Sequence, residues 1–468
     1  MVAAVTLLAA VALLGRAGLG AGQPVPEIDS AHAGVPADET LPHRAGWRRV
    51  TVTPSRGPAF AALLYYPALA GGEGATYDGS AAPYPAVAFG HGFLQTPDRY
   101  AGTLQHLAAA GFFVIATESA TGASPDHAQF ALDLRESLTY LQQAGEQPDS
   151  WLYQQVRSSR FGVFGHSMGG GASVLAAAGD ERIGALAHLA AADTRPSAVA
   201  AMRDVRVPFH TIVGSQDTIV PPASTRRIHD AGGPPRILST IAGGSHCGFQ
   251  TTPFPIGCDR GSLPATDQIA LTARLLQAFF QVYLDTEDAW RAVWGPEAEA
   301  GPPLGREADP GLALTPADQR GQAAPGADAT YELLLRNAGR QAAAFGLEPE
   351  PSEWPVTIEP EVTEVLAPGA AAVVRVAVRV PPGAQAGAAG SVLVSAFRLG
   401  DRGTRAYAVL STSVTADAPV RSPTPTESPT PDATPTPTDT ARPAPTREPT
   451  LTAAPAAPRP LFLPRAGR

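Results

Sequence analysis

The stretch that decides the fold is Arg160-Phe161-Gly162-Val163-Phe164-Gly165-His166-Ser167-Met168-Gly169-Gly170-Gly171. Its apolar run ends in Gly-x-Ser-x-Gly, and a helical pattern of small residues, 172–178, follows at once. A strand that turns so sharply into a helix holds its middle residue in a strained conformation, with the side chain above the sheet edge. Gly165 and Gly169 permit the turn, because Cβ atoms there would collide. The pattern predicts Ser167 as a nucleophile at the positive end of a helix; the alternative is a glycine-rich turn with an incidental serine.

The composition is that of a globular chain with more than one domain. The chain has 468 residues, of which 44% are hydrophobic and 16% are charged, and two or three domains are expected. A formal net charge of −9 offers no basic surface, so we expect no nucleic-acid partner. The sequence contains no phosphate-binding loop and no cluster of metal ligands, and we expect no cofactor.

The N-terminus is typical of an exported protein. Residues 2–14 form an apolar run that is too short to span a bilayer comfortably, and small residues follow up to Gly22. This pattern predicts a signal peptide over 1–22 and a polar leader over 23–46, and the alternative is a buried N-terminal helix. We therefore expect a secreted or cell-surface protein.

The chain contains two cysteines, Cys247 and Cys258. In an exported protein, one close pair predicts a disulfide, and two free thiols are the alternative. A disulfide that closes a loop of this size stabilises the fold by about 2–3 kcal/mol in the chain-entropy model.

Strand-like and helix-like segments alternate through the first half of the chain. This alternation predicts the α/β class, with a mostly parallel sheet covered by helices on both faces, over residues 47–300. The expected strands are 47–52, 60–66, 84–89, 112–117, the run before Ser167, 209–214 and 236–241, and the expected helices are 100–110 and 129–142.

A serine hydroxyl needs a base, and the base needs a carboxylate that orients it. Asp217 follows the predicted strand 209–214, and His246 follows the strand 236–241, so both lie at the sheet edge where Ser167 is expected. The chain order Ser, Asp, His is the one that hydrolases with this elbow use. The competing residues are Asp193 and Asp204 for the acid and His91, His106, His166 and His210 for the base.

The loop Gly90-His91-Gly92-Phe93 follows the strand 84–89. In such an architecture this loop can aim a backbone N–H at a developing oxyanion, and the residue after the nucleophile supplies the second N–H. The sequence therefore predicts an oxyanion hole made by Phe93 and Met168. The alternative is that the glycines only turn the chain.

The second half has a different pattern. Residues 301–326 are rich in Pro, Gly, Ala and Asp and are expected to form a linker. Short alternating strands separated by Pro-Gly turns then predict a small all-β sandwich over 327–415. Pro-Thr and Ser-Pro repeats over 416–468 predict a disordered stalk, which would associate the protein with a cell surface or cell wall.

With these residues placed, the region 47–284 resembles the α/β-hydrolases, and it is most similar to the bacterial cutinase and polyester-hydrolase group, near the dienelactone hydrolases, chlorophyllases and platelet-activating-factor acetylhydrolases. The resemblance lies in Ser158-Ser159-Arg160, in the elbow, and in the loops of Asp217 and Ser245-His246. It implies Ser167 as nucleophile, Asp217 as acid, His246 as base, and Phe93 and Met168 as oxyanion donors.

The sequence departs from that group at two places. The segment 189–194 lacks the tryptophan usual in polyester hydrolases, and Cys247 stands where an aromatic residue is common. In the sandwich, Asn337-Ala338-Gly339 and the Leu366-Ala367-Pro368-Gly369 turn resemble immunoglobulin-like accessory modules of bacterial surface enzymes.

The resulting expectation is a secreted, monomeric serine hydrolase that cleaves carboxylic esters through an acyl-serine intermediate. Its substrate is a small or polymeric ester. Two alternatives remain open: a serine peptidase of the prolyl-oligopeptidase type, and a non-catalytic surface protein that retains the fold.

Overall fold

The computed structural model describes residues 40–253 and 257–416. The predicted signal peptide, most of the predicted leader and the predicted stalk beyond residue 416 lie outside these described residues. Within the described ranges, no helix is both long enough and apolar enough to cross a membrane.

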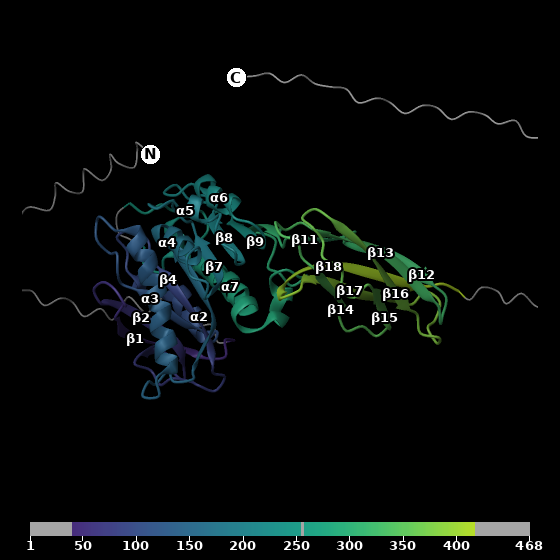
Figure 1. The fold of residues 1–468 in the computed structure, drawn as a ribbon, viewed down its shortest axis with the longest axis horizontal. Helices are drawn as coiled ribbons and strands as arrows, with labels where there is room; N and C mark the ends of the chain where they lie inside the picture. Colours follow the sequence, from purple (N-terminus) through teal and green to yellow (C-terminus); the bar gives the residue numbers. More distant parts are fainter. Residues whose placement is uncertain (1–39, 254–256, 417–468) are drawn as a thin grey trace, which may run out of the picture. The chain divides into compact units, whose positions relative to one another are not determined.

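A ten-stranded sheet forms the centre of the first domain (Figure 1). Its strand order is β10-β9-β8-β7-β6-β4-β5-β2-β1-β3, and the six neighbours from β9 to β5 run parallel. The mostly parallel sheet that the sequence predicted is therefore confirmed. The strands are β1 (Arg44–Val52), β2 (Phe60–Ala68), β3 (Gly72–Glu73), β4 (Tyr84–Gly90), β5 (Phe113–Thr117), β6 (Val156–His166), β7 (Ile183–Leu189), β8 (Phe209–Gly214), β9 (Arg236–Ile241) and β10 (Leu304–Asp309).

Helices cover both faces of the sheet, because its central strands are apolar on both sides: every residue of β4, β7 and β8 is buried. One face packs against α2 (Ala101–Ala109) and α7 (Ala265–Phe280), and the other packs against α3 (His127–Glu146) and α4 (Met168–Ala177). The α/β prediction is confirmed. The remaining helices are α5 (Ala198–Ala201), α6 (Pro222–Ala231), the 3-10 helices η1 (Pro97–Tyr100), η2 (Cys247–Phe249) and η4 (Glu287–Ala292), and the π-helical turn η3 (Gln281–Asp285).

The second domain consists of two four-stranded sheets with one apolar core between them. Alternate residues of β13 are buried, which is the period expected of strands in a sandwich. The predicted β-sandwich is therefore confirmed. One sheet contains β11 (Leu312–Thr315), β13 (Asp328–Asn337), β16 (Ala371–Arg379) and β15 (Val356–Glu359), and the other contains β12 (Asp318–Ala323), β18 (Asp401–Val414), β17 (Ala389–Arg398) and β14 (Phe345–Pro349).

The prediction of a linker over 301–326 is wrong, because this segment contains three strands. β10 pairs with β9 and extends the ten-stranded sheet, while β11 and β12 are edge strands of the sandwich. Five of the six residues of β12 are exposed or half-buried, so the segment lacks the apolar alternation that marks a strand in sequence. The first domain also begins earlier than residue 47, since β1 starts at Arg44.

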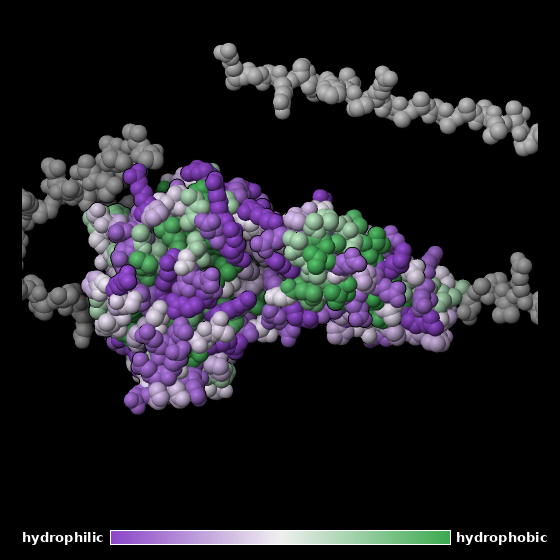
Figure 2. Space-filling view, viewed as in Figure 1, coloured by the Kyte–Doolittle hydropathy of each residue, from purple (hydrophilic) through white to green (hydrophobic). Residues whose placement is uncertain are grey.

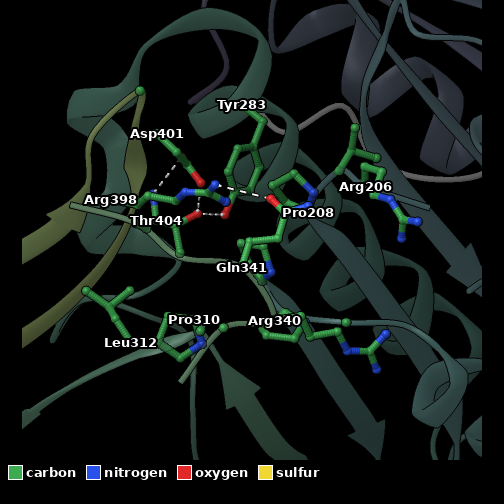
Figure 3. Close-up of a pocket in the computed structure, with 18 of the residues that line it drawn as sticks. Arg206, Pro208, Tyr283, Pro310, Leu312, Arg340, Gln341, Arg398, Asp401 and Thr404 are labelled. Carbon is green, nitrogen blue, oxygen red and sulfur yellow. Dashed lines mark hydrogen bonds between the residues drawn. The ribbon is translucent and has the colours of Figure 1, made fainter. Parts of the chain in front are cut away.

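Polar and aromatic side chains connect the two domains, which belong to one compact unit. The Tyr283 hydroxyl lies 2.9 Å from the Thr404 hydroxyl and accepts the indole N–H of Trp294 at 2.7 Å. A cavity of about 650 Å³ lies beside this contact, with Arg206 and Arg340 at its wall (Figure 3). Figure 2 shows hydrophobic residues gathered on the surface of the sandwich.

Candidate active site

Ser167 lies between β6 and α4, at the turn that the sequence predicted. Its backbone has φ 55° and ψ −117°, a left-handed conformation that a non-glycine residue adopts only where the surroundings enforce it. A Cβ on Gly165 would lie 2.3 Å from the carbonyl oxygen of Gly169, and a Cβ on Gly169 would lie 2.0 Å from that of Gly90. The tight elbow is therefore confirmed, and both glycines are sterically required.

Asp217 and His246 meet at the same sheet edge. Asp217 follows β8, His246 follows β9, and the His246 Nδ1 lies 2.8 Å from the Asp217 Oδ2. The second carboxylate oxygen of Asp217 accepts the N–H groups of Ile219 at 2.9 Å and Val220 at 2.7 Å. Because the carboxylate only accepts hydrogen bonds, the proton of the ring lies on Nδ1, and Nε2 keeps a lone pair for proton transfer.

The imidazole of His246 packs beside the elbow. Its ring centroid lies 4.4 Å from that of His166, the residue before Ser167. No hydrogen bond joins the Ser167 hydroxyl to the His246 ring within the described ranges. Serine–histidine hydrogen bonds are often long before substrate is bound, and they tighten in the reacting complex. Both residues are buried, Ser167 being 9% and His246 5% exposed, and the His246 ring lies against the residue that precedes Ser167.

The competing residues serve other contacts. Asp193 accepts the Ser197 hydroxyl at 2.8 Å and the Val199 N–H at 3.2 Å, so its carboxylate caps the start of α5. Asp204 is exposed. The histidines bond elsewhere: His91 to the carbonyls of Gly92 and Ser119, His106 to Gln277, His166 to Tyr100, and His210 to Ser239.

The loop that carries Phe93 lies directly beside the elbow, since Gly90 of β4 pairs with Gly165 of β6. The N–H of Phe93 has no acceptor among the residues that the structure describes. Met168 is the first residue of α4, where N–H groups have no partner within the helix. In the part of the chain that the structure describes, the Phe93 N–H thus has no acceptor and the Met168 N–H has none within α4, at the positive end of the α4 dipole.

Two residues that we did not predict hold these loops in place. The buried Tyr100 hydroxyl accepts the N–H of Gly92 at 3.1 Å and lies 2.9 Å from Nδ1 of His166. Burial, and after it the neighbouring His246 ring, holds the pKa of His166 well below its usual range, so His166 stays neutral. On the other side, the amide of Gln268 bonds both the N–H of Ser245 at 2.9 Å and its carbonyl at 2.8 Å.

A disulfide joins Cys247 to Cys258, as predicted, and Cys247 is the residue directly after His246. Within residues 40–253 and 257–416, no group of three or more His, Cys, Asp or Glu side chains is placed to hold a metal ion.

Comparison with known proteins gives two family matches. Residues 49–230 match a family model described as PET hydrolase-like, and residues 323–393 match the NPCBM-associated NEW3 domain of alpha-galactosidase. The first match includes Ser167 and Asp217 and ends before His246. No curated protein matched the chain.

The first match supports a hydrolase that acts on esters, and the second agrees with the accessory module expected from the sequence. The first domain therefore has the α/β-hydrolase fold and is similar to the PET hydrolase-like family over residues 49–230, and a β-sandwich similar to the NEW3 domain follows it.

Proposed function

We propose that this protein is a serine carboxylic-ester hydrolase that works through an acyl-serine intermediate. The observation that carries the proposal is the 2.8 Å contact between the buried Asp217 carboxylate and Nδ1 of His246, beside a serine in a left-handed elbow conformation. Ser167, Asp217 and His246 follow β6, β8 and β9 at one edge of the sheet, and this placement supports their proposed roles as nucleophile, acid and base.

In the proposed reaction, Nε2 of His246 removes the proton of Ser167 as the hydroxyl attacks the ester carbonyl. Asp217 holds the ring and stabilises the imidazolium that forms. The N–H groups of Phe93 and Met168 hold the oxyanion, and each such donor is worth roughly 3–4 kcal/mol. His246 then protonates the leaving alcohol, and water releases the acid by the same steps.

We infer that the substrate carries apolar groups beside its ester. Leu94, just past the oxyanion loop, is 40% exposed, and Ile219, two residues after Asp217, is 46% exposed. These loops follow β4 and β8, on either side of β6 and β7. An apolar side chain on each side of the nucleophile favours ester substrates with an apolar acyl or alcohol part.

We also infer that the chain works outside the cytosol, as a monomer. The Cys247–Cys258 disulfide supports the location outside the cytosol, because disulfides persist in oxidising compartments. A signal peptide over 1–22 and a stalk over 416–468 would respectively export the chain and associate it with a cell surface.

The test is a substrate panel with the full chain. We expect hydrolysis of 4-nitrophenyl acetate, butyrate and octanoate, and no release from peptide anilides. The variant Ser167→Ala should lose at least a thousandfold in kcat while its melting temperature stays close to that of the parent. An amorphous polyester film added to the panel tests polymeric substrates. Cleavage of the anilides alone would favour the peptidase, and equal ester hydrolysis by Ser167→Ala would refute the mechanism.

A further inference from the structure

One carboxylate outside the proposed triad bonds to both loops that carry its acid and base. Asp259 Oδ2 accepts the backbone N–H of Thr218 at 3.0 Å and that of His246 at 3.1 Å. Asp259 Oδ1 accepts the N–H of Cys247 at 3.0 Å. Thr218 is the residue after Asp217. A single side chain therefore joins the loop after β8, here called the acid loop, to the loop after β9, here called the base loop.

These contacts bear directly on the geometry of the site. Hydrogen bonds from N–H groups to an ionised carboxylate are stronger than those between neutral groups, and three of them converge on Asp259. The 2.8 Å contact between Asp217 and His246 depends on how their two loops are placed relative to each other. A displacement of about 1 Å in a catalytic group can lower a rate by roughly a hundredfold.

The residues around Asp259 are attached to the same two loops. Residues 258–263, here called the bridging segment, begin at Cys258, whose disulfide partner Cys247 adjoins His246. The Ser262 N–H donates to the Gln216 side chain at 2.8 Å, beside the acid. The N–H of Leu263 donates to the carbonyl of Gly243 at 3.0 Å, in the base loop. The bridging segment therefore spans both loops, and the disulfide fixes its first residue.

We propose that Asp259 is a positioning residue for the reaction at Ser167, and that the Cys247–Cys258 disulfide keeps Asp259 in place. The carboxylate acts through Asp217 and His246 and does not touch the substrate. This inference rests on the proposed esterase function, since the loops that Asp259 joins are those of the proposed acid and base.

The test compares Asp259→Ala and Asp259→Asn with the parent full chain. Asp259→Ala should lower kcat for 4-nitrophenyl butyrate by about tenfold to a hundredfold with KM within twofold. The loops of Asp217 and His246 would no longer be held in position relative to each other, while the residues that contact the substrate stay the same. Asp259→Asn should recover part of kcat, since its one carbonyl oxygen can still accept the N–H groups of Thr218 and His246. Amide hydrogen exchange in peptides that cover 216–220 and 244–248 should rise in the alanine variant.

Asp180→Ala is the matched control. Asp180 also accepts a backbone N–H, that of Arg182 at 3.0 Å, but it lies between α4 and β7, at the opposite edge of the sheet. This variant should lose stability and keep kcat. If Asp259→Ala keeps kcat within twofold, or if its loss matches only its unfolded fraction, the inference is wrong. An inactive parent protein would instead refute the proposed function, and the exchange measurement would still report on the loops.

The role of the disulfide is tested by the double variant Cys247→Ser, Cys258→Ser. It should lower kcat, and adding Asp259→Ala should lower kcat by no more than a further twofold, because both changes release the same carboxylate. If the combined variant loses kcat by the product of the two separate factors, the disulfide does not act through Asp259. An unchanged kcat in the double cysteine variant would show that the disulfide does not keep Asp259 in place.

Discussion

Replacing Asp217 with asparagine changes one atom and should remove most of the activity. One carboxylate oxygen of Asp217 accepts the N–H groups of Ile219 and Val220 at 2.9 and 2.7 Å. The carbonyl of an asparagine must take that place, because its NH₂ group would face two donors there. The NH₂ group then points at Nδ1 of His246, which in the parent protein lies 2.8 Å from the other carboxylate oxygen of Asp217. Nδ1 must accept this hydrogen bond, so the ring proton moves to Nε2 and the base loses its lone pair.

The loss expected from this tautomer is about 10⁴ in kcat, or roughly 5 kcal/mol of transition-state stabilisation. The assay is the hydrolysis of 4-nitrophenyl butyrate at pH 7.5, with the melting temperature measured on the same sample. Asp193→Asn serves as the control, since Asp193 caps α5 and does not contact His246. A kcat for Asp217→Asn within tenfold of the parent would refute the assignment of the acid.

Three further predictions concern the fold. Gly169→Ala should prevent folding or lower the melting temperature sharply, because its Cβ would lie 2.0 Å from the carbonyl oxygen of Gly90; thermal melts check this. Burial lowers the pKa of His188 to about 3 and that of His229 to about 4. The unfolded chain therefore binds protons first as the pH falls below about 6.5, and urea titrations should show a lower free energy of unfolding at pH 5 than at pH 7. Tyr283→Phe removes a buried hydroxyl between the domains and should cost roughly 1–3 kcal/mol in urea titrations without changing kcat.

The sequence was informative wherever a local pattern fixes the geometry. A strand, Gly-x-Ser-x-Gly and a helix are consecutive in the chain, so the elbow at Ser167 could be read directly. Parallel strands end at the same edge of a sheet, which is why residues that follow β8 and β9, Asp217 and His246, could be expected near the serine. Apolar runs that are buried on both faces identified the central strands of the sheet.

The contacts that secure the site were not predictable in this way. Tyr100 reaches His166 across 66 positions of the chain, and Gln268 reaches Ser245 across 23. Neither residue stands in a pattern that marks its role, because each acts through tertiary packing. Asp259 also stands in no sequence pattern, since its contacts with Thr218 and His246 span 41 and 13 positions of the chain. The strands within 301–326 were missed because polar edge strands share their composition with linkers.

The measurement that tests the central claim most directly is labelling of the full chain with a fluorophosphonate, followed by intact-mass and peptide mass spectrometry. Such reagents react with a serine only where a base and an oxyanion hole activate it. We predict one adduct per molecule, on Ser167, and none on Ser167→Ala. No adduct on the folded parent protein, or an adduct on another residue that persists in Ser167→Ala, would contradict the claim that Ser167 is the nucleophile.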